Sequence, residues 1–143
     1  MEEIAKYSGC FVCGDKNDKG LNARFFYDGT KAITELVATE QFEGYRGIYH
    51  GGVLSTLLDE VMIKAILALD IYVVTAEITV RFVAPVRIGD NLSLTGWVTK
   101  QKRRVFHTEG RAVDQDGNLL ATATAIYVEA NPDLKTELMQ SIQ

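Results

Sequence analysis

The feature that most constrains the fold is a stretch that begins with His50, Gly51 and Gly52 and continues as a long, mainly apolar run. With residues placed 100° apart, this run divides into two faces, which predicts a helix that reaches about Leu69. The broad apolar face contains Val53, Leu54, Leu57, Leu58, Val61, Met62 and Ala65. The polar face contains Ser55, Thr56, Asp59, Glu60 and Lys64. An apolar face this wide predicts a helix that the rest of the protein mostly covers.

The two acidic residues of this helix differ in their local partners. Glu60 precedes Lys64 by four residues, the favourable order for an ion pair along a helix, and this pair is predicted to lie on a solvated face. Asp59 lies at the edge of the apolar face, and no basic residue of its own helix stands at the right spacing. A carboxylate in this position is a candidate functional group. A solvated aspartate that meets a partner from another segment is the equally weighted alternative.

The two glycines indicate a close approach at the start of the helix. Glycine is a costly way to begin a helix unless a ligand or another backbone segment must come near. The free N–H groups of a helix N-terminus attract anions or a polarised carbonyl oxygen. Gly51 and Gly52 are therefore candidate binding residues, and a tight turn near the N-cap is the alternative.

Length, charge and composition bound the class of protein. The chain has 143 residues, which predicts one domain, and its net charge of −4 argues against nucleic acid as a main partner. It has no apolar run long enough to cross a bilayer, and its acidic N-terminus lacks the core of a signal peptide. We therefore expect a cytoplasmic protein without a membrane partner. The single domain is predicted to span residues 1–143, with a core over roughly residues 8–130 and a polar, helical tail over residues 131–143.

Alternation of apolar and polar residues predicts strands on both sides of the helix. Two are expected before it, over residues 21–27 and 32–38, with a turn at Asp28-Gly29. Four are expected after it, beginning near Thr75, Leu92, Phe106 and Leu119. Alanines on one face of the last strand would let the sheet come close to the helix. The order ββαββββ predicts an α+β fold with an antiparallel sheet.

Several short motifs together resemble one known family. His-Gly-Gly, with an acid nine residues after the histidine, is similar to the hotdog-fold acyl-CoA thioesterases of the phenylacetate-pathway and 4-hydroxybenzoyl-CoA thioesterase type. The segment from Thr75 to Val86, the turns at Gly89-Asp90 and Asp116-Gly117, and the prefix Cys10-Phe11-Val12-Cys13-Gly14 also resemble parts of that family. The resemblance covers roughly residues 8–130 and implies a sheet wrapped around one long central helix.

The resemblance implies hydrolysis of the thioester of an acyl- or aryl-CoA. Asp59 would act as general base or nucleophile, and the Gly51-Gly52 helix start would polarise the carbonyl group. Thr75 matches the position of a water-orienting residue. The strand alternation puts Thr75 on the face opposite Ile78, unless twist or a bulge redirects it. No cofactor is expected.

Four further residues are predicted to bind the substrate. His50 is a candidate for fixing the loop before the helix by a hydrogen bond. Tyr45 belongs to that loop, which suits a mobile wall of a substrate cleft. Arg103 and Arg104, in a basic turn, are candidates for contacts with the phosphates of CoA, and a solvated hairpin tip is the alternative.

The two cysteines are predicted to have a structural role. Cys10 and Cys13 cannot complete a four-ligand zinc site alone, and the nearest histidine in the sequence is His50. The pair also precedes a polar loop rather than opening a helix after a strand, as a thioredoxin-type motif would. No metal is therefore expected, and zinc shared between subunits is the disfavoured alternative.

The length of the helix predicts an active site shared between two chains. His50 and Asp59 are nine residues apart, or about 13 Å at about 1.5 Å per residue. A carbonyl group that contacts Gly51 cannot also lie beside Asp59 of the same chain. We expect a homodimer with two shared sites, with a dimer of dimers left open. Two alternatives to hydrolysis remain, an acyl-thioester hydratase or dehydratase on the same fold and a non-enzymatic module that binds acyl-CoA.

Overall fold

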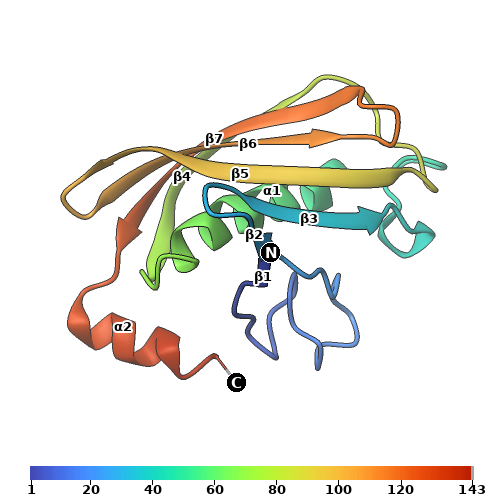
Figure 1. Cartoon of the computed structure of the whole chain (residues 1–143). Helices are drawn as coiled ribbons and strands as arrows, with labels where there is room; N and C mark the ends of the chain where they lie inside the picture. The colour runs from blue at the N-terminus through green and yellow to red at the C-terminus, as the bar shows by residue number, and fades with distance from the viewer. Residues whose placement is uncertain (143) are drawn as a thin grey trace.

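The computed structural model describes residues 1–142 and combines one sheet with two α-helices and a short 3-10 helix (Figure 1). The elements in chain order are β1 (Glu2–Glu3), β2 (Phe26–Tyr27), β3 (Ala32–Val37), η1 (Glu40–Phe42), α1 (Gly51–Leu67), β4 (Val73–Phe82), β5 (Asn91–Lys102), β6 (Val105–Val113), β7 (Leu119–Glu129) and α2 (Pro132–Met139). The predicted ββαββββ order is confirmed from β2 to β7. The short strand β1 precedes this order and pairs with β2.

The seven strands form one antiparallel sheet in the order β1-β2-β3-β5-β6-β7-β4. The predicted turn at Asp28-Gly29 joins β2 to β3, and Gly29 has a φ of 105°, which favours glycine. β4 follows α1 and lies at the edge of the sheet, where β7 is its one hydrogen-bonded neighbour among the described strands. One side of β4 is therefore open.

The strand predicted over residues 21–27 is wrong for its first five residues. The backbone N–H groups of Leu21 and Ala23 donate to the carbonyl oxygens of Phe11 and Val12, at 2.7 and 2.8 Å. The N-terminal segment thus takes the hydrogen bonds that a neighbouring strand would have used, and only Phe26–Tyr27 joins the sheet.

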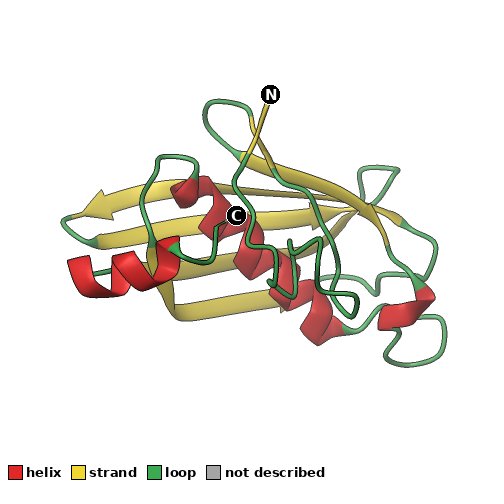
Figure 2. Cartoon of the chain, turned by 90° about the horizontal axis from the view of Figure 1, so that it is seen from below, coloured by secondary structure: helices red, strands yellow, loops and turns green. Residues whose placement is uncertain are grey.

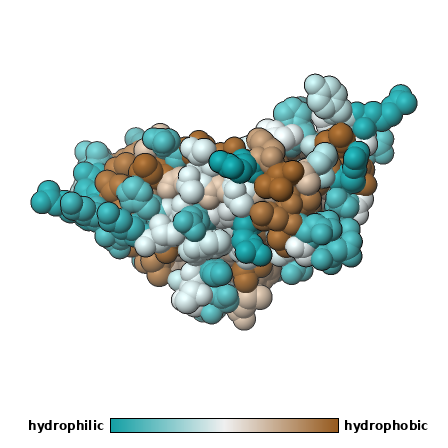
Figure 3. Space-filling model, turned by 90° about the horizontal axis from the view of Figure 1, so that it is seen from above, coloured by the Kyte–Doolittle hydropathy of each residue, from teal (hydrophilic) through white to brown (hydrophobic). Residues whose placement is uncertain are grey.

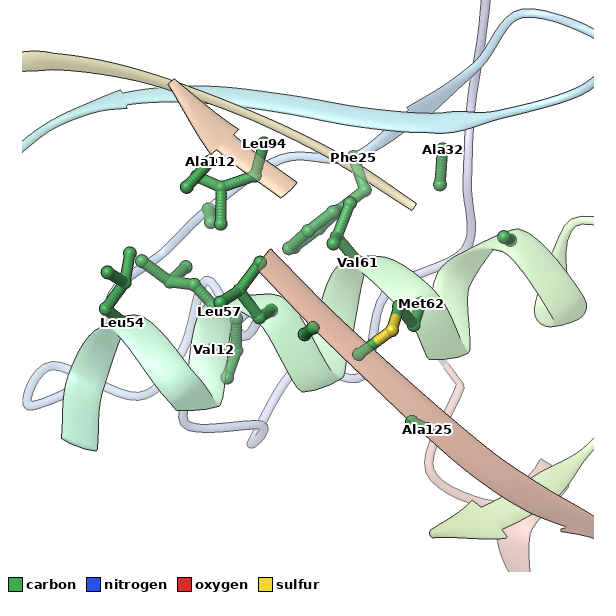
Figure 4. Close-up of a cluster of buried hydrophobic side chains, with 14 of the residues drawn as sticks. Val12, Phe25, Ala32, Leu54, Leu57, Val61, Met62, Leu94, Ala112 and Ala125 are labelled. Atoms are coloured by element: carbon green, nitrogen blue, oxygen red, sulfur yellow. The ribbon is translucent and has the colours of Figure 1, made fainter. Parts of the chain in front are cut away.

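Helix α1 crosses the concave side of the sheet (Figures 1 and 2). It ends at Leu67, two residues before the predicted end. The predicted apolar face is confirmed, since six of its seven residues are buried and Val53 is half-buried. Figure 4 shows side chains of α1 and of the sheet meeting in this core, among them Leu54, Leu57, Val61, Leu94 and Ala112.

Small residues of the sheet let α1 lie close to it. Gly96 of β5, Gly110 of β6 and Ala123 of β7 are paired in register. A Cβ atom on Gly96 would lie 2.8 Å from the carbonyl oxygen of Val61, so any larger residue would push the helix away. The alanines of the last strand are buried beneath α1, as predicted.

The predicted solvation of Glu60 and Lys64 is wrong. Their ion pair exists, with 3.7 Å between Lys64 Nζ and Glu60 Oε2, but Lys64 is 0% exposed and Glu60 is 9% exposed. The N-terminal segment covers this face of α1 with buried residues such as Val12 and Cys13. Distant chain segments, rather than the local pattern, decide the environment of this pair.

The C-terminal helix α2 begins where the sequence predicts. The Asn131 side chain caps it by accepting a hydrogen bond from the Leu134 N–H at 2.9 Å.

Figure 3 views the molecule from above, on the side of the sheet opposite α1, where hydrophilic and neutral residues separate the hydrophobic patches. Within residues 1–142, no helix has both the length and the apolar character needed to cross a bilayer.

Candidate active site

The carboxylate of Asp59 is held by two hydroxyl groups from the sheet. The Tyr127 hydroxyl donates to Asp59 Oδ1 at 2.8 Å and lies 3.0 Å from the backbone oxygen of Asp59. The Thr75 hydroxyl lies 3.1 Å from Oδ1 and 3.4 Å from Oδ2. Asp59 itself remains half-buried. The partner that its own helix does not supply therefore comes from β4 and β7.

A bulge in β4 explains how Thr75 reaches Asp59. The pairing of β4 with β7 shifts between Thr75 and Glu77, so that Thr75 lies opposite Tyr127 and Ile78 lies opposite Ala125. Tyr127 and Ala125 are both buried on the side of β7 that faces α1. The bulge thus places Thr75 and Ile78 on the same side, which removes the conflict in the strand alternation.

Tyr127 is the residue of this site that the sequence analysis missed. Its side chain is 0% exposed, and burial, followed by the nearby charge of Asp59, raises the pKa of its hydroxyl. A signal was present in the sequence. Tyr127 continues the alternation of Ala121, Ala123 and Ala125, and it is the one member of that row with a hydrogen-bonding side chain.

The start of α1 is capped by His50. Its Nδ1 atom accepts a hydrogen bond from the Gly52 N–H at 2.9 Å. A Cβ atom on Gly52 would lie 2.9 Å from His50 Cε1, so this cap requires glycine at position 52. A Cβ atom on Gly51 would only touch the Phe82 ring at 3.5 Å. Among the described residues the Gly51 N–H has no hydrogen-bond acceptor, which leaves it available to a ligand.

A cavity of about 300 Å³ lies beside this helix start. Gly51 and Leu54 of α1, Tyr49 before the helix, and Phe82 and Val83 at the end of β4 contribute to its mostly apolar lining. Asp59 is not among its lining residues. A carbonyl group at Gly51 thus has a pocket in this chain, but no carboxylate beside it.

The remaining predicted substrate-binding residues lie at opposite ends of α1. Tyr45, 86% exposed, lies in the loop beside the helix start. Arg103 and Arg104 form the tip between β5 and β6, near the other end of the helix (Figure 1). One Arg104 nitrogen donates to the carbonyl oxygen of Glu129 at 2.6 Å. One chain therefore divides the predicted site into two groups. One group, with Gly51 and Tyr45, lies at the start of α1, and the other, with Asp59 and the arginine pair, lies towards the middle and far end of the helix.

Comparison with known sequences places this architecture in a family. Residues 46–121, more than half of the chain, match the model of the thioesterase superfamily. A putative esterase of Caenorhabditis elegans is 30% identical over 82 residues, which cover 56% of this chain and 48% of that protein. Human acyl-coenzyme A thioesterase 13 is 26% identical over 80 residues, 54% of this chain and 57% of that protein. The chain thus matches about half the length of these curated relatives.

Solved structures agree on the fold. The Escherichia coli PaaI protein from the phenylacetic acid degradation operon is 23% identical, with a TM-score of 0.74 over 81% of this chain and 87% of that chain. A hypothetical thioesterase of Streptococcus pneumoniae, solved with coenzyme A, is 20% identical, with a TM-score of 0.73 over 77% of this chain and 90% of that chain. The expected hotdog fold is confirmed. The chain belongs to the thioesterase superfamily.

Proposed function

We propose that the protein hydrolyses the thioester bond of an acyl- or aryl-CoA. The observation that carries this proposal is the half-buried Asp59 carboxylate, fixed by hydroxyl groups of Tyr127 and Thr75 in a chain of the thioesterase superfamily. The likeness to human acyl-coenzyme A thioesterase 13 and to a coenzyme A-bound thioesterase supports the same substrate class.

Asp59 acts as the general base or as the nucleophile. Both hydroxyl groups lie closest to Oδ1, which leaves Oδ2 the freer oxygen to take a proton from water or to attack the carbonyl carbon. Thr75 can accept a hydrogen bond from the attacking water while it donates to Asp59. In two other structures of the Streptococcus pneumoniae thioesterase, alanine replaces an aspartate or a threonine sixteen residues later, the same spacing as between Asp59 and Thr75.

The helix start stabilises the oxyanion that forms when the carbonyl group is attacked. The Gly51 N–H is the first donor, because it has no competing acceptor in the described chain. The Gly52 N–H donates to His50 Nδ1, so it would add a second donor only if the imidazole turned away from the cap.

Two chains complete each active site. The helix start and Asp59 lie about 12 Å apart along one α1, too far for one reacting carbonyl group. β4 offers the surface for a second copy, because its outer edge is unpaired and Phe82 and Val83 at its end are 54% and 52% exposed. Antiparallel pairing of β4 with β4 of a second copy would continue the sheet and bring the helix start of one chain towards Asp59 of the other.

Tyr45, Arg103 and Arg104 serve the CoA portion of the substrate. In the proposed dimer, the loop before α1 that carries Tyr45 in one chain and the β5–β6 tip that carries the arginine pair in the other flank the same site, since these two segments lie at opposite ends of α1 (Figure 1). Guanidinium groups bind phosphates through paired N–H donors, and the exposed hairpin tip leaves Arg103 free to do so.

A panel of acyl-CoA and aryl-CoA esters, with detection of the free thiol of released CoA, tests this function. The expected result is release of CoA many times in excess of the protein, with one acyl class preferred. Matched 3-hydroxyacyl and 2-enoyl esters should lose their thioester rather than interconvert. Interconversion without CoA release would assign a hydratase, and tight binding without any turnover would assign a binding module.

A further inference from the structure

A second cluster of reactive groups lies on the face of α1 that points away from the sheet. There the N-terminal segment crosses the helix (Figure 2) and brings Cys10 and Cys13 to Glu60 and Lys64. The two sulfur atoms and a Glu60 carboxylate oxygen lie within 4.8 Å of one another. None of these four groups takes part in the proposed hydrolysis, so their burial together requires another explanation.

The backbone around Cys10 is arranged to stabilise a thiolate. The N–H groups of Val12 and Cys13 point at Cys10 Sγ, at 3.4 and 3.5 Å. The neighbouring Cys13 thiol, followed by these two N–H groups and the charge of Lys64, holds the pKa of Cys10 below its usual value. A hydrogen bond from the Gly14 N–H to the Cys10 carbonyl oxygen, at 2.9 Å, closes the turn and keeps the two cysteines together.

Lys64 requires an anion in this cluster. Its ammonium group is 0% exposed, lies 3.4 Å from Cys13 Sγ and 4.8 Å from the centre of the Tyr7 ring, and donates to the Ala5 carbonyl oxygen. Glu60 only partly balances this charge, because its Oε2 atom lies 3.7 Å from the ammonium, farther than Cys13 Sγ, and burial raises the pKa of its carboxyl group to about 7. Its Oε2 atom is buried, and within residues 1–142 no hydrogen-bond donor reaches it. The thiol pair is therefore placed to share the negative charge opposite Lys64.

Solvent reaches one cysteine and not the other. Cys10 is half-buried and lines a cavity of about 540 Å³ between the N-terminal segment, α1 and α2, together with Glu60, Ile63 and Leu138. Cys13 is 1% exposed. A small oxidant that enters the cavity reaches the half-buried Cys10 first, because Cys13 is buried next to it. This is the arrangement of an attacking and a resolving thiol.

We propose that Cys10 and Cys13 form a peroxide-reactive pair that closes to a disulfide. The Cys10 thiolate attacks one oxygen of a hydroperoxide, the O–O bond breaks, and an alcohol or water leaves after taking up a proton, with Cys10 left as a sulfenic acid. The Cys13 sulfur then attacks the Cys10 sulfur, the S–O bond breaks, and the thiol proton departs with the hydroxide as water. The peroxide is reduced and the two thiols are oxidised.

The same donors raise the alternative of a thiophilic metal ion bound by Cys10, Cys13 and Glu60. Lys64 weighs against it, because its ammonium already lies 3.4 Å from one donor and 3.7 Å from another. A divalent ion in that space would be repelled by the Lys64 ammonium, which is fully buried and cannot move into solvent. A bound metal ion is therefore the disfavoured state of this cluster, and the experiments distinguish it from the thiol pair.

The first test follows Cys10 alone in a Cys13→Ser variant, whose hydroxyl keeps a donor beside Cys10. Iodoacetamide should alkylate the folded protein at a rate that changes little between about pH 6.5 and 8, because Cys10 is already a thiolate. In the same chain unfolded in urea, the rate should rise about ten-fold per pH unit, as for an ordinary thiol. The same pH dependence in both states would overturn the proposal.

The second test treats the wild-type protein with near-stoichiometric hydrogen peroxide, then unfolds and alkylates it. Neither cysteine should react, the intact mass should be lower by two hydrogen atoms, and a thiol reductant should restore both sites. In a Cys10→Ser control, Cys13 should survive the same peroxide treatment as a free thiol, because it is buried. Two free thiols in treated wild type, or an over-oxidised Cys10 beside a free Cys13, would contradict the pair.

The third test measures the metal content of the protein as purified, which distinguishes the thiol pair from a metal site. The thiols of the wild-type protein should react without a chelator, and wild type and the Cys10→Ser variant should hold the same low level of metal. One thiophilic ion per chain in wild type alone, which must be removed before either thiol reacts, would replace the proposed thiol pair with a metal site.

Discussion

Asp59 and Glu60 are neighbours on α1, but they face different parts of the molecule. Asp59 faces the edge of the sheet, where Tyr127 and Thr75 donate hydrogen bonds to it. Glu60 faces the N-terminal segment, where it lies 3.7 Å from the buried Lys64 and burial raises its pKa to about 7. One carboxylate is thus held in place at a half-exposed position, and the other is enclosed within a balanced group of charges.

The difference shows that the same side-chain chemistry is used for two purposes on one helix. Two neutral hydroxyl donors orient the Asp59 carboxylate, and among the described residues no cation pairs with it, which suits a base or a nucleophile. An enclosed ammonium and two thiols leave Glu60 with little access to a substrate in the Asp59 site. The comparison therefore favours Asp59 over Glu60 as the proposed catalytic acid and favours a structural or charge-balancing role for Glu60.

The largest expected effect separates the two acids directly. Asp59→Asn should lower kcat for acyl-CoA hydrolysis by at least about two orders of magnitude, since it removes the proposed base or nucleophile. The matched variant Glu60→Gln should retain most of the activity. Both are measured by CoA release after a check of the fold by circular dichroism. If Glu60→Gln loses more activity than Asp59→Asn, the assignment of the two acids is reversed.

The next effect tests whether Asp59 works with the helix start of a second chain. Gly51→Val and Asp59→Asn should each inactivate the protein, because they damage different halves of every site. In a mixed dimer, one site has both defects and the other has neither. Equal mixing gives about half hybrids, so roughly a quarter of the wild-type activity should return.

The control for this mixing experiment is subunit exchange, followed with differently tagged chains. No recovery of activity in a sample that has exchanged would place the complete site within one chain. It would also remove the geometric reason for assigning separate roles to Gly51 and Asp59.

A smaller effect concerns the hydroxyl groups that hold Asp59. Thr75→Val keeps the shape of the side chain and should lower kcat about ten-fold, or about 1.4 kcal/mol of transition-state stabilisation. The thermal midpoint should change little, because Thr75 is exposed on an edge strand. An unchanged kcat would leave Thr75 as an ordinary strand residue and Tyr127 as the main support of Asp59.

The smallest effect concerns the pH dependence of stability through Glu60. The pKa of Glu60 is raised from 4.5 to about 7 in the folded protein, so the folded state binds more protons than the unfolded state between these pH values. Its contribution to the free energy of unfolding is therefore complete below pH 4.5 and is lost as pH rises towards 7. The loss is at most about 3 kcal/mol.

Urea unfolding across this pH window, with wild type and Glu60→Gln, measures that contribution. The variant should show a shallower fall in the free energy of unfolding as pH rises, because a glutamine has no proton to lose. Parallel pH profiles for the two proteins would mean that Glu60 is ionised in the folded state throughout, with Lys64 as its full partner.

Much of the fold follows from repeating patterns in the sequence. The apolar face of α1, the strands after it and the helical start of the C-terminal tail are local properties that the structure confirms, whereas the alternation fails at the bulge in β4 and before Phe26. The candidate acid was also visible, because Asp59 lacks a partner on its own helix. Periodicity reports burial over a few turns or strand residues, so these features need no knowledge of distant segments.

The surroundings of both acids were decided only by the tertiary structure. The bulge in β4 turns Thr75 towards Asp59, and the register of β7 places Tyr127 beside the same carboxylate. The N-terminal segment covers Glu60 and Lys64, which the helical pattern alone had placed in solvent. A helix pattern shows which residues share a face, but the free energy of burying a charge depends on which remote chain segment packs against that face and which partners it supplies.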